Sequence, residues 1–158
     1  MSESSGGVAT NGSSTNGGHK PEEVVVDFLL ALAHGDLDGA LDLVTEDLVW
    51  INVSLPTVHG REAFERLARN ILRPGRMGFD VHLNHVAVEG NVVITDRIDE
   101  LNFGRFATCF WVYGRFVVRD GKIAVWRDSF DWLDITIANV RGLIGLFLPT
   151  LNRTLPPE

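Results

Sequence analysis

The chain has 158 residues, 45% of them hydrophobic and 22% charged, with a formal net charge of −7; this is the size and balance of a single globular domain. The acidity and the absence of basic runs argue against a nucleic-acid-binding protein. No stretch of about 18 apolar residues predicts a membrane-spanning helix and no signal-peptide pattern opens the chain, so we expect a cytoplasmic protein that does not bind membranes.

The predicted domain lies between two polar tails. Residues 1–19 are rich in Ser, Gly, Asn and Thr and offer almost nothing to bury, so we expect them to be disordered. Residues 150–158 have the composition of a loose C-terminal tail. The single domain is therefore expected to span residues 20–149.

Helical patterns open this domain. The first predicted helix opens at residue 21 with Pro and two acids, as the first turn of a helix prefers, and closes at His34-Gly35. Residues 36–44 carry a second, shorter apolar stripe, and residues 46–54 have the pattern of a strand. The apolar and charged residues of 61–72 alternate as in an amphipathic helix, and Pro74-Gly75 end it.

The rest of the domain is rich in strands. Four long strands are predicted, at about residues 79–88, 92–101, 105–118 and 122–131. Tight turns at Gly90-Asn91 and Asp120-Gly121 join consecutive strands, and a last helix is predicted over residues 131–147. Helices followed by antiparallel strands indicate an α+β fold. We expect a strongly curved, mostly antiparallel sheet with helices on its concave side, which forms a cone around an internal pocket.

The last strand places a carboxyl group on a face that should be buried. Alternation puts Ala124, Trp126, Asp128 and Phe130 on one side of this strand. Three of these side chains are apolar, so this side is expected to face the core. A lone buried carboxylate is very costly, and Asp128 must therefore be paired or protonated.

An arginine on another strand is the candidate partner. Arg97 shares a strand face with Val93, Thr95 and Asp99, and Asp99 lies one step of about 6.6 Å away. The planar guanidinium has five donors, enough to hold two carboxyl groups. Asn52, which shares a face with Trp50, is in a position to add an amide. The same spacing is also compatible with a structural ion pair or with a charged face in solvent.

Other reactive residues form no recognisable site. His82 and His85 are three apart on a strand and should face opposite ways, which is poor metal geometry. The remaining histidines are expected in tail or loop positions: His19, His34 and His59. Cys109 is the single cysteine of the sequence, so an internal disulfide is excluded. It lies in a predicted strand, where we expect a buried, inert thiol. No phosphate-binding loop or nucleophile elbow occurs, so no metal or cofactor is predicted.

Three segments resemble limonene-1,2-epoxide hydrolases. They are TDRIDEL at 95–101, DGKIAVWRDSFDW at 120–132 and VWINVSLPTVHGREA at 49–63. The similarity extends over residues 21–135. It implies the cone-shaped α+β fold shared with nuclear transport factor 2 and ketosteroid isomerase.

The resemblance implies a role for each polar residue. An Asp-Arg-Asp triad opens an epoxide in one step in that family, without a covalent intermediate. Asp99 matches the acid, Arg97 the bridging guanidinium, Asp128 the base that takes a proton from water, and Asn52 a residue that positions the water. Trp50 stands where the family commonly has a Tyr, and an indole can donate a hydrogen bond but cannot accept one.

The expected chemistry needs water and an epoxide and no cofactor. Two ionised Asp residues beside one Arg would leave a net negative charge in an apolar cavity, so we predict a raised pKa for Asp99 and an ionised Asp128. The substrate is expected to be lipophilic and small, and the resemblance implies a homodimer. The expected lining of the pocket is largely apolar: Leu29, Leu32, Leu101, Phe110, Val112 and Phe130.

Two other functions remain open. Cone-shaped relatives include ketosteroid-type isomerases and cyclases, although an isomerase has no use for a bridging Arg97. A non-catalytic module for small-ligand binding or dimerisation is the other possibility. The last predicted helix is more apolar than one core face requires, so it either closes the pocket or meets a second subunit. Its apolar residues are Leu133, Ile137, Val140, Ile144 and Phe147.

Overall fold

The computed structural model describes residues 19–72 and 77–145. Its helices are α1 (Pro21–Ala33), α2 (Leu37–Asp42), α3 (Arg61–Ile71) and α4 (Trp132–Gly145). Its strands are β1 (Val44–Asn52), β2 (Val58–His59), β3 (Gly78–Glu89), β4 (Val92–Phe103), β5 (Phe106–Arg119) and β6 (Lys122–Phe130). The predicted tails at 1–19 and 150–158 lie outside the described residues except for His19, and so does Phe147. No helix in the described part is long and apolar enough to cross a membrane.

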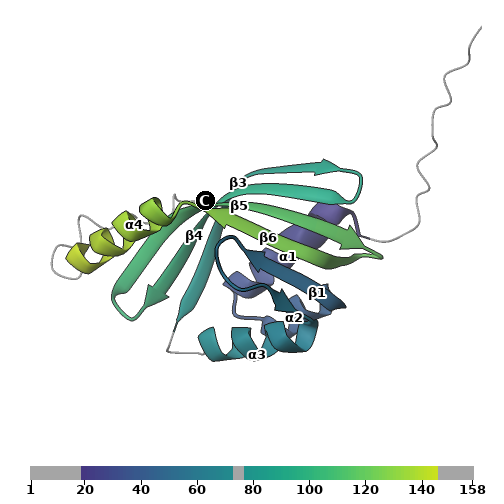
Figure 1. Ribbon diagram of the computed structural model, residues 1–158, viewed down its shortest axis with the longest axis horizontal. Coiled ribbons are helices and arrows are strands. Elements are labelled where there is room, and N and C mark those ends of the chain that lie inside the picture. The colour runs from purple at the N-terminus through teal and green to yellow at the C-terminus, as the bar shows by residue number, and fades with distance from the viewer. Residues whose placement is uncertain (1–18, 73–76, 146–158) are drawn as a thin grey trace, which may run out of the picture.

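The strands form one open sheet in the order β2-β1-β6-β5-β4-β3. All neighbours are antiparallel except β1 and β6, which run parallel. Helices α1, α2 and α3 lie on one side of this sheet, while α4 projects from one end of it (Figure 1). The structure confirms the α+β prediction, with a mostly antiparallel sheet that does not close.

Helix α1 supplies much of the core. Its first turn is capped where Glu23 accepts a hydrogen bond from the Lys20 backbone N–H at 3.1 Å. Its buried face packs against the sheet and α3 and is made of Val24, Val25, Phe28, Leu29 and Leu32. Burial of these side chains holds α1 across the sheet, and this fixes one wall of the space between them.

Two local predictions were wrong near β1. Val44, expected in the second helix, begins β1, is fully buried and pairs with Ile123 of β6. His59, expected in a loop, belongs to the two-residue strand β2, which pairs with Val49 and Trp50 of β1. Two residues are too few to show an alternating pattern, so only pairing in the folded sheet reveals this strand.

The prediction that His82 and His85 face opposite ways was also wrong. Strand β3 carries a bulge between Leu83 and His85, so the two histidines pair with Ile98 and Asp96, which lie on one face of β4. An extra residue in one strand resets its alternation. Among residues 19–72 and 77–145, no three His, Cys, Asp or Glu side chains form a group that could hold a metal ion.

Candidate active site

Arg97 joins two carboxyl groups inside the domain. Its side chain is fully buried, and Asp99 and Asp128 are only 6% and 4% exposed. Arg97 Nε donates to Asp99 Oδ1 at 2.8 Å, and Nη2 donates to Asp99 Oδ2 at 3.2 Å and to Asp128 Oδ2 at 2.7 Å. The sheet therefore brings together the three residues that the sequence placed on two separate strands.

The strand order explains how this contact forms. Strand β5 lies between β4 and β6, so the Arg97 side chain must cross β5 to reach Asp128. Gly114 of β5 pairs with Thr95 on one side and with Asp128 on the other. Because Gly114 has no side chain, the guanidinium can lie over the middle strand.

Thr95 is a fourth member of this cluster that the sequence analysis did not assign. It is fully buried, and its Oγ1 accepts a hydrogen bond from Arg97 Nη1 at 3.1 Å. Its position two residues before Arg97, on the same strand face, was the available signal. A buried polar side chain beside a buried charge is expected to be a hydrogen-bond partner.

The buried environment shifts the pKa values of Asp99 and Arg97. Burial raises the pKa of Asp99 to about 6, and the nearby Asp128 adds to this, while Arg97 opposes it. Burial disfavours the charged form of Arg97, but Asp128 and Asp99 outweigh it and raise the pKa of the guanidinium. The direction of this shift is the one expected from the sequence, and it favours a proton on Asp99 closer to neutral pH than for an exposed Asp.

This pKa predicts a specific pH dependence of folding. The Asp99 pKa is 3.8 without the fold and about 6 within it, so Asp99 disfavours folding increasingly as the pH rises from 4 to 6. Asp99→Asn removes that effect. The unfolding free energy of Asp99→Asn relative to wild type should therefore rise by about 2 kcal/mol between pH 4 and pH 7. Urea denaturation at both pH values measures this difference.

Asp47 provides a control of opposite sign. Its hydrogen bond with Arg119 lowers its pKa to about 2, and it lies at the surface. Its contribution is therefore present above pH 4 and lost as the pH falls, so Asp47→Asn should lose a little stability relative to wild type as the pH rises. A parallel response of the two variants would contradict the assignment to Asp99.

A cavity of about 210 Å³ opens beside the two carboxyl groups. Asp99, Asp128 and Asn52 lie in its wall. The other lining residues are apolar or aromatic, and two of them, Trp50 and Trp126, carry an indole N–H group. Five of the six predicted pocket residues line it: Leu32, Leu101, Phe110, Val112 and Phe130. Leu29 does not, because it faces the core of the domain one turn of α1 away from the cavity wall.

Sequence reasoning missed one wall of this cavity. Helix α3 contributes Phe64, Ala68 and Ile71, and residues after it add Leu72, Met77 and Phe79. The spacing of Phe64, Ala68 and Ile71 is that of one helix face, so the apolar side of α3 was the signal. No described residue of α4 lines the cavity, so the suggestion that this helix closes the pocket is wrong for the described part of the chain.

The cavity wall carries unpaired polar atoms. Asp128 Oδ1 and the Nε1 atoms of Trp50 and Trp126 are buried without a hydrogen-bond partner among the described residues. The two indoles stack with ring centroids 4.8 Å apart, and Asn52 pairs with Asp128 across the parallel strands β1 and β6. One carboxylate oxygen and an amide thus face the same space as an acid with a raised pKa.

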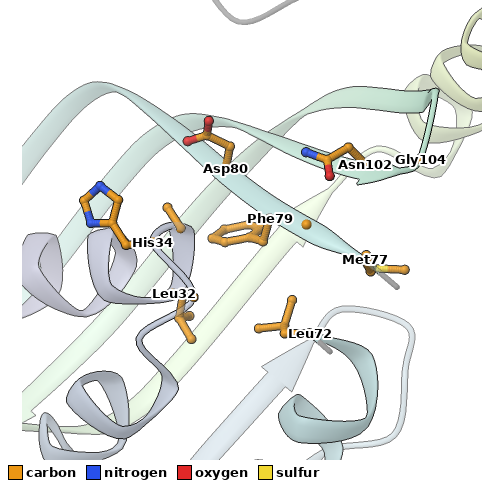
Figure 2. A pocket seen from close by; sticks show the side chains of 11 residues that line it. Leu32, His34, Leu72, Met77, Phe79, Asp80, Asn102 and Gly104 are labelled. Carbon is orange, nitrogen blue, oxygen red and sulfur yellow. The ribbon is translucent and has the colours of Figure 1, made fainter. Parts of the chain in front are cut away.

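Figure 2 shows the lining of a second, larger cavity of about 640 Å³. The two cavities share four apolar residues of their linings: Leu32, Leu72, Met77 and Phe79. His34, Asp80 and Asn102 add polar groups to the larger one. The carboxyl groups therefore line the smaller and more apolar of two neighbouring cavities.

Comparisons with known proteins show the family to which the chain is similar. A family model for the limonene-1,2-epoxide hydrolase catalytic domain matches residues 19–141. Epoxide hydrolase EphG of Mycobacterium tuberculosis is 38% identical over 128 residues, which cover 81% of this chain and 85% of that protein. A solved LEH-like epoxide hydrolase of M. tuberculosis superposes with a TM-score of 0.81 at 37% identity, covering 85% of this chain and 95% of that chain.

More distant structures share only the fold. One is a Catenulispora acidiphila protein with a ketosteroid isomerase-like fold, which has a TM-score of 0.65 at 12% identity. This match covers 75% of the present chain and 92% of the other. The cone-shaped architecture expected from the sequence is therefore confirmed.

Proposed function

The chain belongs to the limonene-1,2-epoxide hydrolase family and is an epoxide hydrolase of that family, and we propose that it opens a lipophilic epoxide to a vicinal diol in one general acid–base step. The observation that carries this mechanism is the shared guanidinium. Arg97 Nη2 bonds both carboxyl groups, yet Asp128 Oδ1 is left unpaired in the cavity wall. The site thus offers one proton donor and one proton acceptor.

Each carboxyl group has a defined task in the proposed step. Asp128 Oδ1 takes a proton from water, the water oxygen attacks one epoxide carbon, and the C–O bond to that carbon breaks. Protonated Asp99 gives its proton to the leaving oxygen. The step leaves a proton on Asp128 and a charge on Asp99, so one proton must pass back before the next turnover.

The remaining polar residues hold the water in this scheme. Asn52 lies opposite Asp128 in the sheet and supplies an amide to the attacking water. Trp50 supplies its unpaired Nε1–H as a donor, in place of the hydroxyl that a Tyr would offer. A lipophilic substrate displaces other water from the cavity, which raises the pKa of Asp99 further and favours its role as the acid.

Oxygen labelling tests the one-step mechanism directly. In a single turnover in ¹⁸O-water, with excess enzyme and limonene oxide, cyclohexene oxide, styrene oxide or a bulky sterol epoxide, the first diol should carry one ¹⁸O atom. A covalent ester on an Asp would instead place unlabelled carboxyl oxygen in the first diol. Mass spectrometry separates the two. Unlabelled diol would overturn the mechanism, and no diol from any epoxide would overturn the function.

We also propose that the protein is a homodimer that uses α4. The outward stripe of this helix is apolar: Leu133, which is 67% exposed, Ile137, Val140 and Ile144. The helix contacts the sheet through its opposite side, where Ala138 is buried. Monomeric proteins rarely leave a contiguous apolar stripe of this kind in water, and a second copy would cover it.

Substitution of a stripe residue should separate the subunits. Val140→Asp places a charge in the proposed interface without touching the core, so the chain should sediment as a folded monomer at micromolar concentration. Leu30→Asp is the matched control, because Leu30 is an exposed leucine on α1. It should leave the dimer intact. A wild-type monomer in the same experiment would contradict the proposal.

A further inference from the structure

Two residues beside Arg97 contact its guanidinium without lining the cavity. Thr95 is fully buried on β4 and accepts from Nη1 at 3.1 Å. Gly114 lies in the interior of β5, between Thr95 and Asp128 in the register of the sheet. Neither residue belongs to the wall of the smaller cavity or to that of the larger one.

Gly114 is explained by space and not by backbone conformation. Its φ is outside the left-handed region, so any residue could adopt its backbone. A Cβ at this position would overlap Arg97 Nη1 and Thr95 Oγ1 and would come within 2.8 Å of Phe116. Glycine weakens a strand interior, and its presence here is accounted for by the guanidinium that lies against it.

Thr95 completes the set of acceptors around Arg97. The Nε and Nη2 groups bond the carboxyl groups, while the Nη1 group bonds Oγ1 of Thr95. Rotation of the guanidinium plane about Nε would break the contact of Nη1 with Thr95 and the contacts of Nη2 with Asp128 and Asp99. A hydroxyl at Thr95 therefore opposes that rotation, and the missing side chain at Gly114 leaves room for the correct orientation.

We propose that Thr95 and Gly114 are positioning residues of the epoxide-opening reaction, which hold the Arg97 guanidinium so that Nη2 reaches both carboxyl groups and Asp128 Oδ1 stays directed into the cavity. The inference rests on the proposed function. Loss of either residue should lower kcat and leave KM unchanged, because neither residue touches the space that the substrate fills.

A displaced Arg97 guanidinium would also change the pKa of Asp99. Among the described residues, the charged groups that face Asp99 are Arg97 on its own strand and Asp128 on β6. Arg97 lowers the pKa of Asp99 and Asp128 raises it. A guanidinium that withdraws from Asp99 must therefore raise its pKa, so the loss of kcat at high pH should begin at a higher pH.

Substitutions at Thr95 test the hydroxyl. Thr95→Val has the same shape without an acceptor and should lower kcat about tenfold at unchanged KM, while Thr95→Ser should recover most of the loss. Thr108→Val is the matched control, because Thr108 is also buried on a strand and its Oγ1 has no partner among the described residues. Equal kcat values for Thr95→Val and Thr108→Val would overturn the role of Thr95.

A single added methyl group tests Gly114. Gly114→Ala should lower kcat about a hundredfold at unchanged KM, the loss expected when a catalytic group moves by about 1 Å. Val118→Ile adds one methyl group to another buried position of β5 and should leave kcat unchanged. If Gly114→Ala does not fold, the Thr95 variants still decide the matter. A folded Gly114→Ala with wild-type kcat would overturn the role of Gly114.

A measurement without substrate separates this inference from the proposed function. Carboxyl ¹³C chemical shifts report the titration of Asp99 in the folded enzyme. The pKa of Asp99 should rise in Thr95→Val and Gly114→Ala and stay unchanged in Thr108→Val and Val118→Ile. If wild type hydrolyses no epoxide but these shifts occur, the function fails and the positioning stands. Wild-type titration in Thr95→Val and Gly114→Ala would overturn the positioning, whatever the activity.

Discussion

Asp128→Asn is expected to lower kcat for diol formation by about 10²- to 10⁴-fold, the range that a general base contributes. The side chain of Asn has the size of Asp, and its carbonyl can still accept from Arg97 Nη2. It then presents an NH₂ group to the cavity where Asp128 Oδ1 was unpaired. This amide cannot take a proton from water.

Diol formation by wild type and Asp128→Asn should be measured side by side, with thermal unfolding as the check on folding. Asp120→Asn is a suitable control, because Asp120 is exposed in the turn after β5 and its positive φ of 52° also suits Asn. It should keep the wild-type rate. Equal rates in wild type and Asp128→Asn would mean that the hydrolysis is background or occurs at another site.

Arg97→Met is expected to remove activity and to destabilise the fold by about 3 to 5 kcal/mol, the typical cost of removing one partner of a buried ion pair. Met fills a similar volume but leaves Asp99 and Asp128 close together without a cation. Because Arg97 lowers the pKa of Asp99, its removal raises that pKa. The stability deficit should therefore grow as the pH rises from 4 to 7.

Chemical denaturation of Arg97→Met at pH 4.5 and pH 7 measures both the size and the pH dependence of the deficit. Arg115→Met, on the exposed side of β5, is the matched control. It should change stability little at either pH. A deficit of under about 1 kcal/mol for Arg97→Met at pH 7 is the size expected for an exposed ion pair. It would contradict the role of Arg97 as the bridge between the two carboxyl groups.

Local patterns in the sequence determined much of the fold and part of the site. Alternation with a period of two depends only on neighbouring residues, so it correctly placed Arg97 and Asp99 on one strand face and Asp128 on a buried face. Turn residues such as Gly90 and Gly121 located the hairpins for the same reason. The cost of burying Asp128 then required a partner, and in the structure Arg97 Nη2 donates a hydrogen bond to this carboxyl group. The roles of Asn52 and Trp50 came from the resemblance alone.

Only the tertiary structure decided how these strands meet. The order of the sheet sets β5 between β4 and β6, and this makes the space over Gly114 necessary and turns Thr95 into a partner of Arg97. The bulge before His85 reverses the expected alternation, and no local sequence pattern predicts this bulge. Whether Leu29 and the apolar face of α3 line the cavity depends on the depth at which each helix packs against the sheet. Such features arise between segments distant in sequence, whereas periodicity describes one segment at a time.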